Sequence, residues 1–467
     1  MEFSSSEENQ SFSLTKFESM LKTNNVFFFD SNEFENIIHH YLEIGKIALA
    51  KKAIKLGLDQ HPTSINLRLF RVEILIFENK LSEAAKLLNM LFELEPNNEE
   101  LYIQKANIHS KRDQHEEAIE VFKQALKVSN DSSEIHSLIG MEYLFLDNYE
   151  AAKIHFKNCI DLNIEDYSSL YNIIYCFEFL DQNQEAIDYL NWYLDQNPYC
   201  EVAWHQLGKQ YLIIKDLNKA LTAFDFAIIS DDTFIGAYLE KAKVLERLNR
   251  FKEAIDNYNI SMAIEGPTAF TYLKIGGCHE KMHHKDKALK YFFNSVKEDP
   301  AFDKGWIQIA HFYFSKKDDL KALFYVNKAI DIDDENVSYW LFYSKTNHRL
   351  NYLEEAERGF KKTLELGGTS LDIWIQRGDV LIELGEIEAA KYNFVQALEY
   401  YPESEELEFR LSGLCFKLND TEAGFAHLLN GLHINSEHIF IIEELFPDVY
   451  KSQNVIQFIE SYKKSDN

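Results

Sequence analysis

One residue type recurs through this chain at a fixed interval of 34 residues. Alanine stands at eleven of twelve successive positions of the series and glycine at the twelfth, with no insertion or deletion between them. Repeat architectures have strict periods of this length, because each repeat buries its apolar face only against its neighbours. The chain is therefore expected to form one continuous row of repeats, although 467 residues would suffice for two or three ordinary domains. The series is Ala50, Ala84, Ala118, Ala152, Ala186, Ala220, Ala254, Ala288, Ala322, Ala356, Ala390 and Gly424.

Other positions of the repeat are constrained more loosely. Counted from Glu201 as position 1, residues 201–234 carry Trp at position 4, Leu-Gly at 7 and 8, Tyr at 11, Ala at 20, Phe at 24 and Ala at 27. This W-x2-L-G-x2-Y…A-x3-F…A spacing resembles the helix-turn-helix unit of the tetratricopeptide repeat (TPR) family. Small residues at positions 8 and 20 are expected where the two helices cross, and aromatic residues at positions 4, 11 and 24 are expected to fill the spaces between helices. Ile38, Val72 and Ile174 are bulky at position 8, so wider helix pairs are expected there.

The resemblance implies an all-α fold, a right-handed α-solenoid (superhelix) of about twelve 34-residue helix-turn-helix TPR units with terminal capping helices. Residues 1–30 are expected to combine a start that is disordered to about residue 12 with a capping helix over residues 13–22. Residues 31–438 are expected to hold twelve tandem repeats, and residues 439–467 the C-terminal capping helices and a polar tail. The expected starts of the repeats are Ser31, Ile65, Glu99, Ser133, Tyr167, Glu201, Ile235, Ala269, Asp303, Val337, Leu371 and Glu405.

The composition argues against several classes of partner. The acidic chain has a formal net charge of -28, and such a surface repels nucleic acid and anionic lipid. No apolar run approaches the roughly 20 residues that span a bilayer, and the first residues do not read as a secretion signal. The five cysteines are widely spaced and form no C-x-x-C pair, as in a reduced protein. We therefore expect a cytoplasmic protein that binds no nucleic acid and does not insert into a membrane.

One short motif suggests metal chemistry. The run from His279 to His283 reads H-E-x-x-H, in which two histidines on one helix hold zinc and the glutamate acts as a base. Here His279 falls on a packing position of its repeat and His283 falls in the expected turn, so the interpretation as a chance match is favoured. The sequence contains no nucleotide-binding motif, no hydrolase motif and no further metal-binding motif. We predict no catalytic residue, no cofactor and no metal, and therefore no enzyme.

The resemblance implies binding at the inner surface of the superhelix, which the first helix of each repeat lines through positions 2, 5, 9, 12 and 13. The family's carboxylate clamp needs lysine at position 5, and no repeat of this chain has one there. The alternative to a binding role is that the aromatic residues pack between helices and the basic ones pair with Glu246 and Glu280. The candidate residues on this face are Met141, Phe145, Tyr171, Tyr175, Phe179, Lys209, Lys243, Arg247, Lys281, Lys345 and Arg349.

These observations favour a non-catalytic scaffold or adaptor that binds a peptide or another protein in its concave groove. The basic candidates would attract an acidic segment of such a partner. A structural subunit that joins a larger or self-associated assembly through its end repeats is the alternative. A monomer is favoured, but the oligomeric state is left open.

Overall fold

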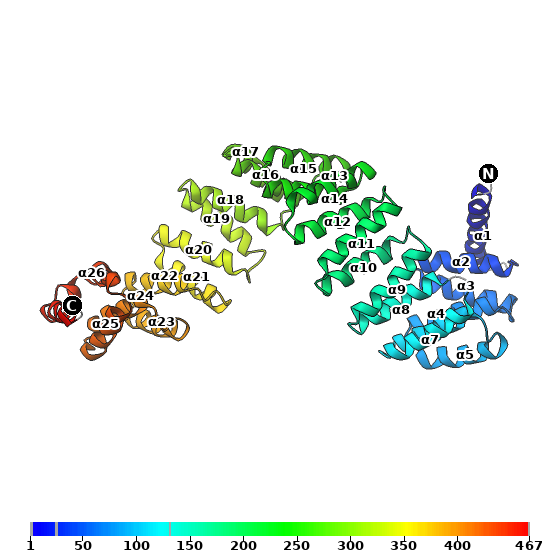
Figure 1. The fold of residues 1–467 in the computed structure, drawn as a ribbon, viewed down its shortest axis with the longest axis horizontal. Coiled ribbons are helices and arrows are strands. Elements are labelled where there is room, and N and C mark those ends of the chain that lie inside the picture. Colours follow the sequence, from blue (N-terminus) through cyan, green and yellow to red (C-terminus); the bar gives the residue numbers. More distant parts are fainter. Residues whose placement is uncertain (1–2, 24–26, 130–131, 466–467) are drawn as a thin grey trace. The chain divides into compact units, whose positions relative to one another are not determined.

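The computed structural model of the chain describes residues 3–23, 27–129 and 132–465. These residues form a succession of helices (Figure 1), and none of them lies in a β-strand. The all-α repeat fold predicted from the 34-residue period is therefore confirmed. Within the same three segments, no helix combines the length and the apolar character that a membrane span requires.

The chain divides into two compact parts, residues 1–237 and residues 238–467, which we call the N-terminal half and the C-terminal half. The N-terminal half begins with one long helix and continues with six helical hairpins. Its helices are α1 (Phe3–Thr23), α2 (Ser31–Glu43), α3 (Ile47–Gln60), α4 (Ile65–Phe77), α5 (Leu81–Leu94), α6 (Glu99–Ser110), α7 (His115–Val128), α8 (Ser133–Phe145), α9 (Tyr149–Leu162), α10 (Tyr167–Phe179), α11 (Asn183–Gln196), α12 (Glu201–Ile213) and α13 (Leu217–Ser230).

The C-terminal half holds six further hairpins and ends with short helices, and the division between the halves falls inside its first helix. In both halves the first helix of each hairpin begins at position 1 of the repeat. The helices are α14 (Ile235–Arg247), α15 (Phe251–Glu265), α16 (Ala269–Lys281), α17 (Lys285–Glu298), α18 (Asp303–Ser315), α19 (Asp319–Ile330), α20 (Val337–Arg349), α21 (Leu353–Glu365), α22 (Leu371–Glu383), α23 (Ile387–Tyr400), α24 (Glu405–Lys417), α25 (Thr421–Asn435), η1 (Ser436–Ile439), α26 (Phe440–Leu445), α27 (Pro447–Tyr450) and α28 (Gln453–Ser465).

Each hairpin turns at position 15, where the backbone is left-handed with φ between 52° and 79°. Nine of these twelve residues are Asn, Asp or Gly, the types that tolerate this conformation. A left-handed residue ends the first helix and redirects the chain, so position 15 separates the two helices of each repeat. The residues are Gly45, Asn79, Asp113, Asp147, Asp181, Lys215, Asn249, His283, Lys317, Asn351, Gly385 and Asn419.

The alanine column at position 20 lies in the core, and all eleven of its alanines are fully buried. The glycine at position 8, however, mainly makes room for the aromatic ring at position 24 of the same repeat, and not for position 20 as the sequence suggested. A methyl group added at Gly208 would lie 2.5 Å from the ring of Phe224, and one added at Gly140 would lie 2.7 Å from the ring of Phe156. At Gly276 a backbone atom of position 20, the carbonyl oxygen of Ala288, would also lie 3.3 Å from the added methyl group.

Bulky residues at position 8 are matched by aliphatic residues at position 24. Ile174 is followed by Leu190 where other repeats have a phenylalanine, and both side chains are buried. The helices of the α2–α3, α4–α5 and α10–α11 hairpins approach each other less closely than those of α12–α13 and α16–α17. The wider helix pair predicted for Ile174 is therefore confirmed, whereas the α2–α3 pair at Ile38 is about as close as α22–α23, which has Gly378 at position 8.

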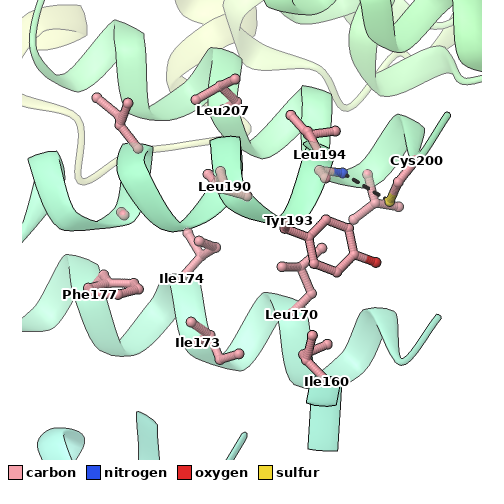
Figure 2. Packing of buried hydrophobic residues seen from close by; sticks show 14 of the residues in the cluster. Ile160, Leu170, Ile173, Ile174, Phe177, Leu190, Tyr193, Leu194, Cys200 and Leu207 are labelled. Atoms are coloured by element: carbon pink, nitrogen blue, oxygen red, sulfur yellow. Dashed lines mark hydrogen bonds between the residues drawn. The ribbon is translucent and has the colours of Figure 1, made fainter. Parts of the chain in front are cut away.

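Interlocking aliphatic side chains fill the space between consecutive repeats. Figure 2 shows this packing, in which Leu170 and Ile173 of α10 lie among Leu190, Tyr193 and other side chains of the neighbouring helices. The hydroxyl of Tyr193 is also satisfied, because it donates a hydrogen bond to the carbonyl oxygen of Ile164. This core holds α10 and its neighbours at fixed rotations, which decides which side chains of α10 face outward.

The first helix covers the start of the N-terminal half. Phe17 and Met20 of α1 are buried against Phe34 and Ile37 of α2. The sequence predicted disorder up to about residue 12, whereas the structure describes α1 from Phe3 onward. That segment contains neither proline nor glycine to interrupt a helix. The segment is polar and lacks the apolar periodicity from which a helix is predicted, so the sequence did not indicate a helix there.

Short helices cover the end of the C-terminal half. Phe446 packs its ring against Gly413 of α24, a position where no side chain would fit beside it. Val455 and Ile459 of α28 join the same core. The expected polar tail continues α28 as far as Ser465. Residues 466 and 467, like residues 1, 2 and 24–26 at the other end, lie outside the described part.

Candidate functional site

Helix α10 presents three aromatic side chains to solvent. Tyr171, Tyr175 and Phe179 are spaced by four residues, so they share one face of the helix. They remain 42%, 43% and 56% exposed, respectively. The opposite face of α10 supplies Leu170 and Ile173 to the core. The exposed aromatics are therefore not needed to pack this helix against its neighbours.

Tyr149, which the sequence analysis did not single out, completes this aromatic face. Its ring stacks on Phe179 with the ring centroids 4.7 Å apart and the planes inclined by 17°. Phe179 also contacts Tyr175 at a centroid distance of 4.7 Å. The Tyr149 hydroxyl donates a hydrogen bond to Asp147, which fixes the ring. We call Tyr149, Tyr175 and Phe179 the aromatic cluster.

A second aromatic pair lies on the preceding repeat. Phe145 at the end of α8 stacks on His115 of α7, with the centroids 5.1 Å apart and the planes inclined by 19°. The Nδ1 atom of His115 lies 2.7 Å from a carboxylate oxygen of Glu142, so this imidazole is held in place. Phe145 and Met141 are both exposed on α8. The apolar candidates of the sequence analysis thus lie on α8 and α10 of the N-terminal half.

These stacked pairs follow one rule of the repeat. Phe145 and Phe179 stand at position 13, and their partners His115 and Tyr149 stand at position 17 of the preceding repeat, 30 residues earlier. Equivalent positions lie 34 residues apart, so the repeat pattern alone does not bring these neighbours together. An aromatic residue at position 17 was the signal that could have revealed Tyr149.

The basic candidates on α20 are already engaged within the C-terminal half. Lys345 forms an ion pair with Asp372 at 3.6 Å. Arg349 pairs with Asp319 at 3.0 Å and lies over the ring of Phe314, 3.9 Å from its centroid. These contacts stabilise neighbouring helices and leave less of both charges for a partner.

The remaining basic candidates differ in how they are engaged. Lys243 pairs with Glu240 at 2.7 Å, and not with Glu246 as the alternative interpretation of the sequence supposed. Lys209 on α12, Arg247 at the end of α14 and Lys281 at the end of α16 take part in no ion pair among the described residues. The structure therefore divides the candidates: the apolar ones and Lys209 belong to the N-terminal half, and the other five basic ones belong to the C-terminal half.

The H-E-x-x-H motif does not form one helical face. Helix α16 ends at Lys281, and His283 lies in the following turn with φ of 61°. His279 is buried, and its ring stacks on Tyr291. Burial lowers the pKa of His279, which keeps the ring neutral and apolar in character. Within the described residues, no three acidic, histidine or cysteine side chains come together in a way that would hold a metal ion.

A chain of helical hairpins with a 34-residue period belongs to the class of helical repeat proteins. The tetratricopeptide repeat family model matches residues 99–132, 133–163, 303–336 and 371–404. These matches identify four of the repeats as tetratricopeptide repeats, and the alanine column continues at the same spacing through the other repeats.

Curated relatives include a repeat protein and a subunit of a complex. A TPR repeat-containing protein of Methanocaldococcus jannaschii is 22% identical over 88% of this chain and 72% of its own length. Anaphase-promoting complex subunit 3 of Schizosaccharomyces pombe is 27% identical over 40% of this chain. Human DnaJ homolog subfamily C member 7 is 24% identical over 42% of this chain. The matches cover only 28% and 42% of the latter two relatives.

Solved structures with a similar fold include a tetratricopeptide repeat protein from Parabacteroides merdae. It has a TM-score of 0.40 and 15% sequence identity, and the match covers 53% of this chain and 97% of that chain. The Cut9–Hcn1 hetero-tetramer of the APC/C has a TM-score of 0.38 and 14% identity over 87% of this chain and 93% of that chain.

Proposed function

We propose that this chain is a non-catalytic scaffold that binds a peptide or protein on the exposed face of α8 and α10. The observation that carries the proposal is the aromatic cluster. Its three rings contact one another, yet Tyr175 and Phe179 stay largely open to solvent. Contiguous apolar surface of this kind marks interaction sites in soluble proteins. Tyrosine is also a frequent anchor of protein interfaces, because it combines apolar area with a hydroxyl group.

The arrangement of the cluster suits an apolar side chain of the partner. Tyr149 is held by Asp147 and by its stack on Phe179, so part of the surface is fixed before binding. A preorganised surface loses less conformational entropy on association. Met141 and Phe145 add exposed apolar side chains on α8. Met is adaptable in shape, which allows partners of different outline to be accommodated.

We also propose that an acidic segment of the partner binds the basic residues that form no ion pair among the described residues. Arg247 and Lys281 are exposed at position 13 of their repeats. They stand out in a protein of net charge -28 and would accelerate association with an acidic segment. Lys345 and Arg349 contribute less, because Asp372 and Asp319 already neutralise them.

The test compares capture of partners by the wild type and by two variants in a pull-down from the native cell with quantitative mass spectrometry. Tyr175→Ala with Phe179→Ala is expected to lose the specific partners through faster dissociation. Tyr199→Ala is the matched control, since Tyr199 lies between α11 and α12 in the same half and is 78% exposed. If the cluster variant folds normally and still captures the same partners, the aromatic cluster is not the binding site.

A second comparison addresses the charged residues. Lys243→Glu with Arg247→Glu is expected to slow association and to flatten its dependence on salt, because the variant removes long-range attraction. Retention of the wild-type salt dependence would show that the partner segment is not acidic.

The five cysteines are free and buried, which supports the reducing, cytoplasmic location expected from the sequence.

The alternative function is a structural subunit of a larger assembly. The similarity to an anaphase-promoting complex subunit favours it, although that match covers 40% of this chain. Association through the end repeats is opposed by their burial, since α1 covers α2 and Phe446 covers α24. Size-exclusion chromatography with light scattering separates the two: a monomer supports surface binding, and a stable oligomer supports the assembly role.

A further inference from the structure

A groove lined by carboxylates lies on the first helices of four successive repeats in the N-terminal half. It has a volume of about 520 Å³ and is bounded by α2, α4, α6 and α8. Its four carboxylates are Glu35, Glu73, Glu100 and Glu134, one from each helix. Leu69, Ile103 and Leu138 supply apolar lining between them. The groove is thus a mixed surface of alternating charge and apolar area, distinct from the aromatic cluster.

The walls of this groove carry more acidic than basic side chains, and His39 is the basic one beside Glu73. No lysine or arginine is among the residues that line it. Uncharged groups donate hydrogen bonds to two of the carboxylates: Ser31 and Asn66 each donate to Glu35 at 3.2 Å, and Gln104 donates to Glu100 at 2.7 Å. Glu73 has neither a hydrogen bond nor an ion pair among the described residues. This contrasts with α20, where both basic side chains have found a carboxylate.

The environment of Glu73 shows the effect of this excess charge. Its carboxylate keeps contact with solvent, but the walls of the groove exclude part of the water around it. This burial, together with the charge of Glu100, raises the pKa of Glu73. A cation placed in the groove would relieve both effects, so the folded protein holds an unfavourable electrostatic arrangement that a positively charged ligand improves.

We propose that this groove binds an extended peptide segment that presents arginine or lysine side chains beside aliphatic ones. The occupant follows from charge complementarity with four carboxylates and from the apolar lining between them. A single metal ion fits less well, because no three of the described acidic or histidine side chains are close enough together to share one. Side chains that alternate along an extended peptide reach surface features that are spread over several repeats.

The site is separate from the proposed function and does not depend on it. Helix α8 contributes Glu134 and Leu138 to the groove, and Met141 and Phe145 to the aromatic surface. A partner with a cationic segment next to an apolar one would therefore contact both surfaces along one helix. Loss of binding at the groove alone leaves the aromatic cluster intact, and the two failures can be told apart.

The experiment measures fluorescence anisotropy of a labelled peptide in which arginine and leucine alternate, with the full chain as binder. The counterpart peptide carries glutamate in place of arginine. Glu73→Gln with Glu100→Gln removes two charges inside the groove. Glu116→Gln with Glu117→Gln removes the same charge from the exposed first turn of α7 and is the matched control. Thermal unfolding of each variant by circular dichroism checks the fold.

The arginine peptide should bind the wild type and the glutamate peptide should not. The groove variant should weaken binding at least about tenfold, as expected for lost charged contacts, and the control less than about twofold. The groove variant should melt no lower than the wild type, because it removes a repulsion. Equal weakening of peptide binding in both variants would mean that the net charge of the chain, and not the groove, attracts the peptide. That result would contradict the proposed site. Calcium alone displacing the peptide at millimolar concentration would also overturn it, in favour of a metal site.

Discussion

Helices α10 and α20 occupy the same place in their repeats but present different chemistry. Positions 9 and 13 are Tyr175 and Phe179 on α10, and they are Lys345 and Arg349 on α20. The aromatic pair keeps its outer surface exposed. The basic pair is engaged by Asp372 and Asp319 of neighbouring helices. The sequence predicts both sets as one candidate surface, and the structure shows that they make different contacts.

The difference arises in one recurring contact, between position 17 of a repeat and position 13 of the next. In the N-terminal half this contact is the stack of Tyr149 on Phe179. In the C-terminal half it is the ion pair of Asp319 with Arg349. A stacked ring still offers its other face to a partner, whereas a paired charge has lost much of its attraction. The repeat thus sets which residues meet, and the residue types decide whether the surface stays available.

The largest effect should come from the packing of positions 8 and 24, which recurs within each of the two halves. Phe224 and Phe292 stand at position 24, are fully buried and pack on a glycine at position 8. Phe224→Ala and Phe292→Ala should each cost about 3–5 kcal/mol of unfolding free energy, because each leaves a cavity. Hydrogen exchange should show the loss in α12–α13 for the first and in α16–α17 for the second. A large loss of unfolding free energy in only one of the two variants would mean that this packing does not stabilise both halves alike.

Overpacking of the alanine column should have a smaller effect. Ala254 is fully buried on α15, and Ala254→Leu should destabilise the protein by about 1–3 kcal/mol. Lys252→Leu on the same helix is exposed and should change the stability far less. The measurement is thermal unfolding followed by circular dichroism. Equal shifts of the melting temperature would contradict the repeat register.

Acid should weaken a histidine contact in the N-terminal half. The Nδ1 atoms of His136 and His155 lie 3.0 Å apart, which requires at least one neutral ring. Burial, with smaller contributions from the charges of His136 and Lys123, lowers the pKa of His155 to about 4. Since the unfolded chain takes up this proton near pH 6.5, stability should fall between pH 6.5 and 4. His155→Gln should show a smaller loss of melting temperature over this range, and an unchanged slope would refute the assignment.

The smallest effect should come from the paired basic residue. Arg349→Ala removes the ion pair with Asp319 and the contact with Phe314. Because the guanidinium group is partly exposed, the loss should be below about 1 kcal/mol. Capture of partners in a pull-down should be unchanged. Lost capture with normal stability would show that Arg349 serves binding after all, and that the contrast with Phe179 is wrong.

The sequence predicted the parts of the fold that repeat with the period of 34. The alanine column located the core, and the bulky Ile174 correctly indicated a wider helix pair. The N-terminal part of α1 escaped prediction, because residues 3–12 lie outside the repeat and carry no apolar pattern. The pairing of positions 8 and 24 also escaped it, since side-chain contact depends on helix rotation as well as on spacing.

The candidate residues were only partly predictable for the same reason. Spacing by four residues was enough to place Tyr171, Tyr175 and Phe179 on one face. The neighbours of that face come from other repeats, and no spacing within one helix reveals Tyr149. Ion pairs such as that of Lys345 with Asp372 depend on which carboxylate lies across the helix boundary. Such contacts require the three-dimensional packing of the repeats.

The central claim is that the exposed aromatic face, and not the ion-paired face, binds the partner. Site-specific photo-crosslinking tests it directly, with p-benzoylphenylalanine introduced in place of Tyr175 in one protein and in place of Lys345 in another. These residues hold the same position on α10 and α20. In the native cell, the probe at residue 175 should yield a discrete crosslinked partner, and the probe at residue 345 should yield none. A partner crosslinked at residue 345 and absent at residue 175 would contradict the account.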